Sequence, residues 1–207
     1  MACAGWLGLL PGAGLGASSR SASVLCQTLH SAAQPTLTGL MQNDNLLEAA
    51  NSALRRSNDD NHLFLRNVAV RMARNLDTIA QTLGNGFPPD ANSPTYASEE
   101  LMKTRLQAVA SAQNDALNLI DGYVQTEELT QARDEFPAGE PAINEGYHTS
   151  DPGTPHDLSV SRERAGTLAA LLESARSRIG DLEEPAGSAI VAAAQVCSSY
   201  QRPAPAK

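Results

Sequence analysis

Apolar residues recur along most of this chain at the spacing of one face of an α-helix, and this pattern constrains the fold more than any other feature. Between residues 61 and 83 they follow one another at steps of 3, 4, 4, 3 and 4, which is the helical period. No stretch shows the alternation of apolar and polar residues that is typical of a half-buried strand. The spacing predicts a helix with one buried stripe, made of Leu65, Val68, Met72, Leu76, Ile79 and Leu83.

Other segments show the same spacing and are bounded by residues that cap or break helices. Pro35 lacks a backbone N–H and is expected to end the first segment, and Glu184-Pro185 is expected to separate the last two. Asp44 or Asn45 is expected to cap the second. The predicted helices are 23–34, 44–57, 61–83, 94–135, 158–182 and 186–200. The expected buried face of the last helix contains Ala189, Ala193, Val196 and Tyr200.

The composition indicates a thin core. Leu, Ile, Val and Phe together make up 41 of 207 residues, whereas Ala alone contributes 33 and aromatic residues only 4%. Ala and Leu are good helix formers, and strands favour Val, Ile and aromatic residues. We therefore predict an all-α fold: a single helical bundle of four to five amphipathic helices over 23–200. Two long loops rich in proline and glycine, 84–93 and 137–157, would interrupt it.

The charge balance and the missing motifs narrow the function classes. A net charge of −8 argues against a protein that binds nucleic acid, because such binding needs a basic face. No stretch approaches the roughly 18 apolar residues of a membrane span. The chain has no signature of a phosphate-binding loop, a zinc protease, a dithiol redox site or a serine hydrolase. Accordingly the sequence predicts no catalytic residue and no cofactor, and a non-enzymatic protein is favoured over an enzyme.

The N-terminal segment 1–22 has three readings. It carries no charge before Arg20, and an apolar run from Trp6 leads to Leu15-Gly16-Ala17, a passable cleavage site for a secretory signal peptide. The absence of Lys and Arg before that run leaves open a flexible arm of the mature protein or an organelle transit peptide. The first reading predicts a periplasmic or secreted protein; the second favours a particle-associated or intracellular one. The segment 201–207 is expected to be a disordered tail.

Two cysteines are candidates for a disulfide. Removal of a signal peptide would take Cys3 with it and leave an even pair, Cys26 and Cys197. A disulfide between them would close a loop of most of the protein and stabilise it by roughly 4–5 kcal/mol. Such a bond needs an oxidising compartment. The alternative is two buried thiols that pack as small apolar groups.

One loop contains a candidate metal site. Two histidines with neighbouring carboxylates can bind zinc or a similar ion, and the loop at 145–157 offers such a set, although its spacing matches no fixed motif. The alternative is a solvated polar loop. Asp59, Asp60 and His62 form a second group that is better explained by helix capping. The candidate ligands in the loop are His148, Asp151 and His156, with Glu145 and Asp157 beside them.

Three functions follow from these observations. The first is a non-enzymatic exported helical protein that acts as a structural or protein-interaction module, with a protein partner or a second copy of itself. The second is a subunit of a large assembly such as a virion. The third is a metal-dependent enzyme that uses the 145–157 loop.

Overall fold

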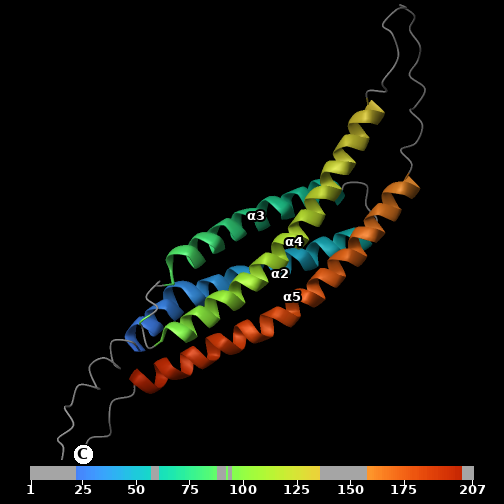
Figure 1. Ribbon diagram of the computed structural model, residues 1–207. Helices are drawn as coiled ribbons and strands as arrows, with labels where there is room; N and C mark the ends of the chain where they lie inside the picture. The colour runs from blue at the N-terminus through green and yellow to red at the C-terminus, as the bar shows by residue number, and fades with distance from the viewer. Residues whose placement is uncertain (1–21, 57–60, 88–91, 93–94, 136–157, 202–207) are drawn as a thin grey trace, which may run out of the picture.

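The described part of the chain forms a bundle of four long helices. The computed structural model describes residues 22–56, 61–87, 92, 95–135 and 158–201, and within these ranges it contains helices and no strand. The all-α prediction is therefore confirmed (Figure 1). A helix at residues 22–28 continues through a π-helical turn, η1 (Leu29–Ala33), into the first long helix. The long helices are α2 (Gln34–Arg55), α3 (Asn61–Asn85), α4 (Tyr96–Glu135) and α5 (Leu158–Gln201).

Successive helices run antiparallel and close into a ring. Helix α2 packs against α3 and α5, and α4 packs against the same two neighbours. Helices α2 and α4 also meet across the diagonal. At 40 and 44 residues, α4 and α5 are the longest helices. A rise of about 1.5 Å per residue makes them about 60 and 66 Å long, and they extend past α2 and α3 at one end of the bundle (Figure 1).

The predicted stripes form the core. All residues of the α3 stripe are buried except Leu76, which is half-buried. Helix α4 contributes a matching stripe, and leucine and alanine predominate throughout, as the composition indicates. The fully buried large side chains include Leu25, Leu29, Leu40, Leu47, Leu65, Met72, Met102, Leu106, Ile120, Leu172 and Ile179.

The prediction that Pro35 ends the first helix is wrong. The chain stays helical from residue 22 to Arg55, and Pro35 lies at the start of α2, directly after the π-turn. In that turn the Gln34 N–H donates to Leu29 O, one residue further back than in an α-helix. A π-turn changes the backbone register, which relieves the clash that proline makes with the preceding turn. Consequently Asp44 and Asn45, expected to cap a new helix, lie in the middle of α2.

The prediction of a break at Pro185 is also wrong, because α5 continues through this residue from Leu158 to Gln201. Proline removes one backbone hydrogen bond, and buried side chains on both sides keep the helix together. The buried face of the last segment differs from the predicted one by about one position. Of the predicted face, Ala193 is buried, Ala189 is half-buried and Val196 is 45% exposed. The buried residues are Ala186, Ile190, Ala193 and Cys197.

None of the described helices is both long and apolar enough to cross a membrane. The predicted arm at 1–22 (apart from residue 22), most of both predicted loops, and the tail beyond Gln201 lie outside the described residues.

Candidate functional site

The structure brings the two predicted cysteines together at one end of the bundle. Cys26 precedes the π-turn and Cys197 lies near the end of α5, and the two are joined as a disulfide with a Cα–Cα distance of 5.5 Å. That separation is typical of disulfides. Both side chains are buried. The pair connects the first described helix to the last one.

A chain of carboxamides crosses the core between three helices. Asn75 Nδ2 donates to Asn43 Oδ1 at 2.9 Å, and Asn43 Nδ2 donates to Gln113 Oε1 at 3.0 Å. Gln113 Nε2 in turn donates to the Leu40 carbonyl at 2.8 Å. Asn43 and Gln113 are completely buried. Because buried polar groups without partners are costly, this network favours one register of α2, α3 and α4.

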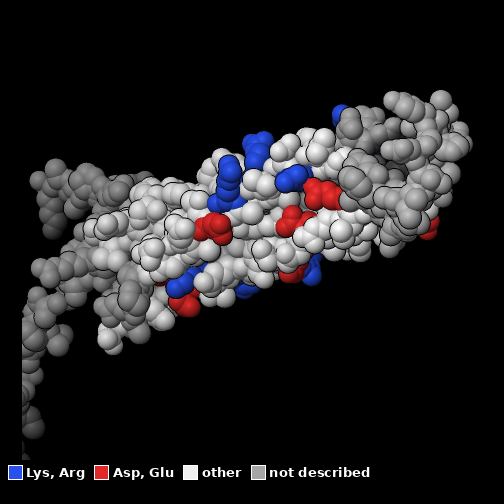
Figure 2. Space-filling view, turned by 90° about the horizontal axis from the view of Figure 1, so that it is seen from above, with Lys and Arg blue, Asp and Glu red and all other residues white. Residues whose placement is uncertain are grey.

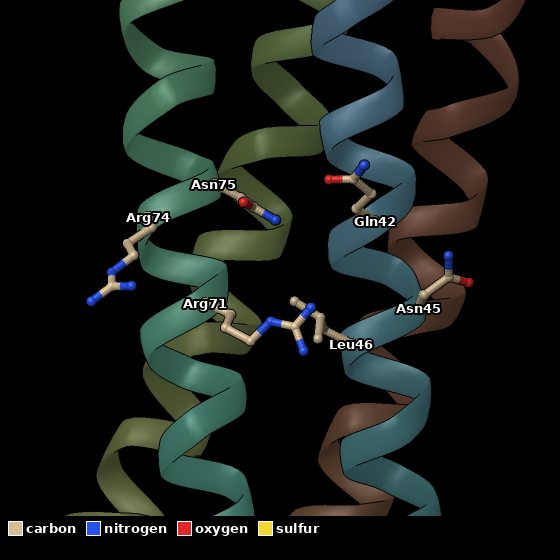
Figure 3. A pocket seen from close by; sticks show the side chains of 6 residues that line it. All are labelled: Gln42, Asn45, Leu46, Arg71, Arg74 and Asn75. Carbon is tan, nitrogen blue, oxygen red and sulfur yellow. The ribbon is translucent and has the colours of Figure 1, made fainter.

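A surface hollow lies beside this network, between α2 and α3. We call it the α2–α3 hollow; it has a volume of about 370 Å³. Figure 3 shows Arg71 extending from α3 toward Leu46 of α2, while Arg74 and Asn45 point away from the gap. The lining residues are Gln42, Asn45, Leu46, Arg71, Arg74 and Asn75. The lining therefore combines two cations and three carboxamides with one apolar side chain, and it includes no carboxylate.

Charged residues fill the opposite side of α2, where it packs against α5. Arg176 lies between Asp44 and Glu48, with N–O distances of 3.6 and 3.7 Å. Glu173 accepts hydrogen bonds from Asn51 at 2.7 Å and from Arg55 at 3.2 Å. Close by, burial raises the pKa of the Glu183 carboxyl above its usual value, the negative charge of Asp44 adds to the effect, and Arg176 opposes it.

A third polar cluster joins α4 to α5. The Glu127 carboxylate is buried and accepts a 2.6 Å hydrogen bond from the Ser161 hydroxyl and a 3.4 Å contact from Arg164. Arg164 also reaches the Thr130 hydroxyl at 3.3 Å. Burial raises the pKa of the neighbouring Tyr123 phenol; Glu127 adds to this shift and Arg164 opposes it. Because the charged groups of this cluster are paired, its hydrogen bonds hold α4 and α5 together.

The predicted metal ligands His148, Asp151 and His156, together with Glu145 and Asp157, lie outside the described residues, so that site remains a prediction. Asp59 and Asp60 also lie outside, and His62 belongs to the first turn of α3. Within the part of the chain that the structure describes, no three His, Cys, Asp or Glu residues are grouped to hold a metal. His30 is exposed and hydrogen-bonds Gln34 at 3.0 Å.

Sequence reasoning missed the core carboxamides and the α2–α3 hollow. The network did leave a signal: Asn43 falls three residues after Leu40 and four before Leu47, and Gln113 falls four after Val109. These are stripe positions that a polar residue occupies only if it finds a buried partner. The hollow left no such signal, because it depends on which sides of α2 and α3 meet.

The search for relatives finds no similarity that could carry a function. No protein-family model, no curated protein and no solved structure matches the chain.

Proposed function

We propose that this protein is an exported, non-enzymatic helical module that works by binding another protein. The observation that carries the proposal is the pairing of Cys26 with Cys197, which joins segments from opposite ends of the chain. Such a bond persists in secreted, periplasmic or other oxidising compartments, and thiols are kept reduced in the cytosol. The disulfide therefore favours a protein that works outside the cytosol.

The surface supports a binding role. Long helices that are tied together form a rigid platform, and rigid platforms bind partners with little loss of conformational entropy. Basic and acidic side chains are interspersed on a mostly uncharged face (Figure 2). Helix α3, which also carries Arg71 and Arg74 of the α2–α3 hollow, adds exposed apolar side chains at Leu63, Phe64 and Val70. Aromatic residues and arginine are the types that contribute most at protein interfaces.

The thiol state of the native protein tests the compartment. Intact mass would be measured after alkylation, with and without prior reduction. We expect Cys26 and Cys197 to take up the alkylating reagent only after reduction, which peptide mapping would assign. Both residues alkylated without reduction would contradict export into an oxidising compartment.

Native mass spectrometry of the protein taken from its own source tests the binding role. We expect a complex with a second protein that survives mild purification. A protein that is monomeric throughout would contradict the proposal, whatever its thiol state.

A subunit of a large assembly is the second candidate. Every long helix leaves a large apolar side chain exposed, namely Met41, Leu63, Leu129 and Val191, so contacts on several sides would bury apolar surface. This candidate predicts free thiols and a particle-sized complex, so the same two measurements separate it from the first.

A further inference from the structure

The α2–α3 hollow has the chemistry of an anion-binding site. Its lining residues Arg71 and Arg74 are exposed and three positions apart on α3, so their side chains start from neighbouring points of one helix surface. Among the described residues neither arginine forms an ion pair, although six other arginine–carboxylate contacts join the helices. A guanidinium group presents a planar fork of donors that matches a carboxylate. The two positive charges are therefore free to meet a negative group from outside.

The wall of the hollow is held in place from within. Asn75 lines the hollow and donates at 2.9 Å to the buried Asn43, which is itself fixed by Gln113. Gln42 points from α2 toward α3 across the gap (Figure 3). Because the core network orients Asn75 before any ligand arrives, less entropy is lost on binding.

Charge complementarity indicates the kind of partner. The chain has a net charge of −8, whereas the lining of the hollow contains two cations and no anion. A locally positive spot attracts and orients an acidic surface. Arg74 points away from α2 on the outer side of α3 (Figure 3), where an acidic side chain that protrudes from a larger partner can reach it.

An exposed apolar side chain lies on the same side of α3. Phe64 is seven residues before Arg71, two helical turns away, and it is 43% exposed. A partner segment that reaches both residues would place a carboxylate at Arg71 and an apolar side chain near Phe64.

We infer that the α2–α3 hollow is the docking site for an acidic segment of a partner protein, with one Asp or Glu carboxylate of that segment bound by Arg71 in the gap and a second met by Arg74 at its outer side. The inference rests on the proposed binding function and names the surface and the chemistry that it uses. Arg71 extends toward α2 and makes the principal contact, whereas Arg74 points outward and adds a second positive charge for the same segment (Figure 3).

Fluorescence anisotropy with a labelled oligoglutamate peptide tests the inference on the full, oxidised chain. We expect saturable binding that weakens with added salt, and no binding of an oligoglutamine peptide of equal length. The double substitution Arg71→Ala with Arg74→Ala should weaken binding by about tenfold or more. The conservative Arg71→Lys keeps the charge but loses the fork, so its affinity should fall between those of the wild type and Arg71→Ala.

The matched control removes two charges elsewhere. Arg105 on α4 and Arg162 on α5 are exposed helical arginines, and changing both to Ala should alter affinity by less than about twofold, since distant exposed charges are screened. Equal weakening by the two double variants would show attraction to net charge alone and overturn the inference. Circular dichroism should give the same helix content for all variants.

The remaining outcomes are also decisive. No saturable oligoglutamate binding overturns the inference. Inorganic phosphate that binds at Arg71, while oligoglutamate does not, would make the hollow a site for a small oxyanion and overturn the acidic partner. A native complex that survives substitution of Arg71 and Arg74 overturns this inference and leaves the proposed function standing, whereas free thiols without a complex overturn the proposed function itself.

Discussion

Helix α2 meets its neighbours through two chemically different sides. Toward α3 and α4 it presents Asn43, a neutral amide inside a network that satisfies both ends of its side chain. Toward α5 it presents carboxylates. In the contacts of the described residues, that side joins four carboxylates, Asp44, Glu48, Glu173 and Glu183, with two cations, Arg55 and Arg176.

The difference shows that a core made mostly of leucine and alanine can specify how its helices pack either by neutral hydrogen bonds or by charged contacts and a disulfide. On the amide side, each hydrogen bond determines which residues face one another, so the register is set by neutral groups that need no water. On the charged side, the buried atoms Arg176 Nε and Glu183 Oε1 have no hydrogen-bond partner among the described residues, although Arg176 Nε lies 3.6 Å from Asp44 Oδ1, and negative charge is in excess. The disulfide lies on this second side, since Cys197 belongs to α5 and Cys26 to the helix that leads into α2. A covalent bond thus reinforces the interface with the less favourable electrostatics.

Removing the disulfide should lower the free energy of unfolding more than any other change, and it tests how far the charged side of α2 depends on this bond. The bond spans 171 residues of sequence, and a loop of that length is worth about 5 kcal/mol in the chain-entropy description. We expect Cys26→Ala with Cys197→Ala to lower the free energy of unfolding by about that amount in denaturant titrations. Hydrogen exchange should then rise first along α5 and residues 22–33.

The reductant-treated wild type gives the control, because it should unfold at nearly the same denaturant concentration as the double variant. The variant itself should be insensitive to reductant. Equal stability of the oxidised and reduced wild type would mean that the interface between α2 and α5 is stable without the disulfide.

Breaking the amide network should have the next largest effect. Gln113→Leu keeps the volume but leaves the buried Asn43 Nδ2 without an acceptor, and we expect a loss of about 3 kcal/mol from thermal or chemical unfolding. Replacing both partners, with Asn43→Leu and Gln113→Leu together, should cost less than the sum of the single changes. Two leucines leave no orphaned group between them, and Asn75, which then loses its acceptor, is only half-buried and can be hydrated.

The matched substitution is Gln107→Leu, the same change at an exposed position of α4, which should change stability by less than about 0.5 kcal/mol. If Gln107→Leu and Gln113→Leu are equally tolerated, the neutral network is dispensable and the contrast between the two sides of α2 loses its basis.

The first half of the bundle also depends on a close backbone approach at Gly86. A Cβ there would lie 2.5 Å from the Ala32 Cβ and 2.7 Å from the Thr82 carbonyl oxygen, so Gly86→Ala should cost about 2 kcal/mol by overpacking. Gly84 lies two residues away with open space around its Cβ position. Gly84→Ala should therefore be neutral or stabilising by up to about 1 kcal/mol. Equal unfolding midpoints for the two variants would contradict this account.

The sequence predicts the helices better than their ends. The stripe of α3 from Leu65 to Leu83 is visible as spacing, because burial of one face imposes a helical period on the residues. Pro35 and Pro185 lead to wrong helix ends, because proline inside a helix costs about 3 kcal/mol in intrinsic propensity. The burial of side chains on both sides of each proline nevertheless keeps the helix continuous. Propensity is a local property, and burial depends on the neighbouring helices.

The candidate site is less predictable for the same reason. Cys26 and Cys197 could be proposed as a pair from the sequence, because removal of Cys3 with a signal peptide would leave only one partner choice, but two free thiols fitted the sequence equally well. Arg71 and Leu46 could not be placed together, since their proximity depends on the rotation of α3 relative to α2. Polar residues at stripe positions, namely Asn43 and Gln113, point to the neighbouring core network and not to the hollow itself.

The smallest predicted effect is a pH dependence on the charged side of α2. Burial, together with Asp44, raises the pKa of Glu183 in the folded protein, so folding favours the protonated carboxyl. The stability that protonated Glu183 contributes is fully present below the ordinary pKa of glutamate, and it is lost as the pH rises through the folded-state pKa. Glu183→Gln should therefore stabilise the protein at neutral pH, and this gain should shrink as the pH falls toward the ordinary glutamate value. Unfolding midpoints of both proteins, measured across this range, would check it.

The neighbouring Glu184 is exposed, and Glu184→Gln removes the same charge without relieving burial, so it should give a smaller change. A Glu183→Gln variant that is less stable than the wild type at neutral pH would mean that attraction to Arg176 outweighs burial, and that both sides of α2 are equally well satisfied.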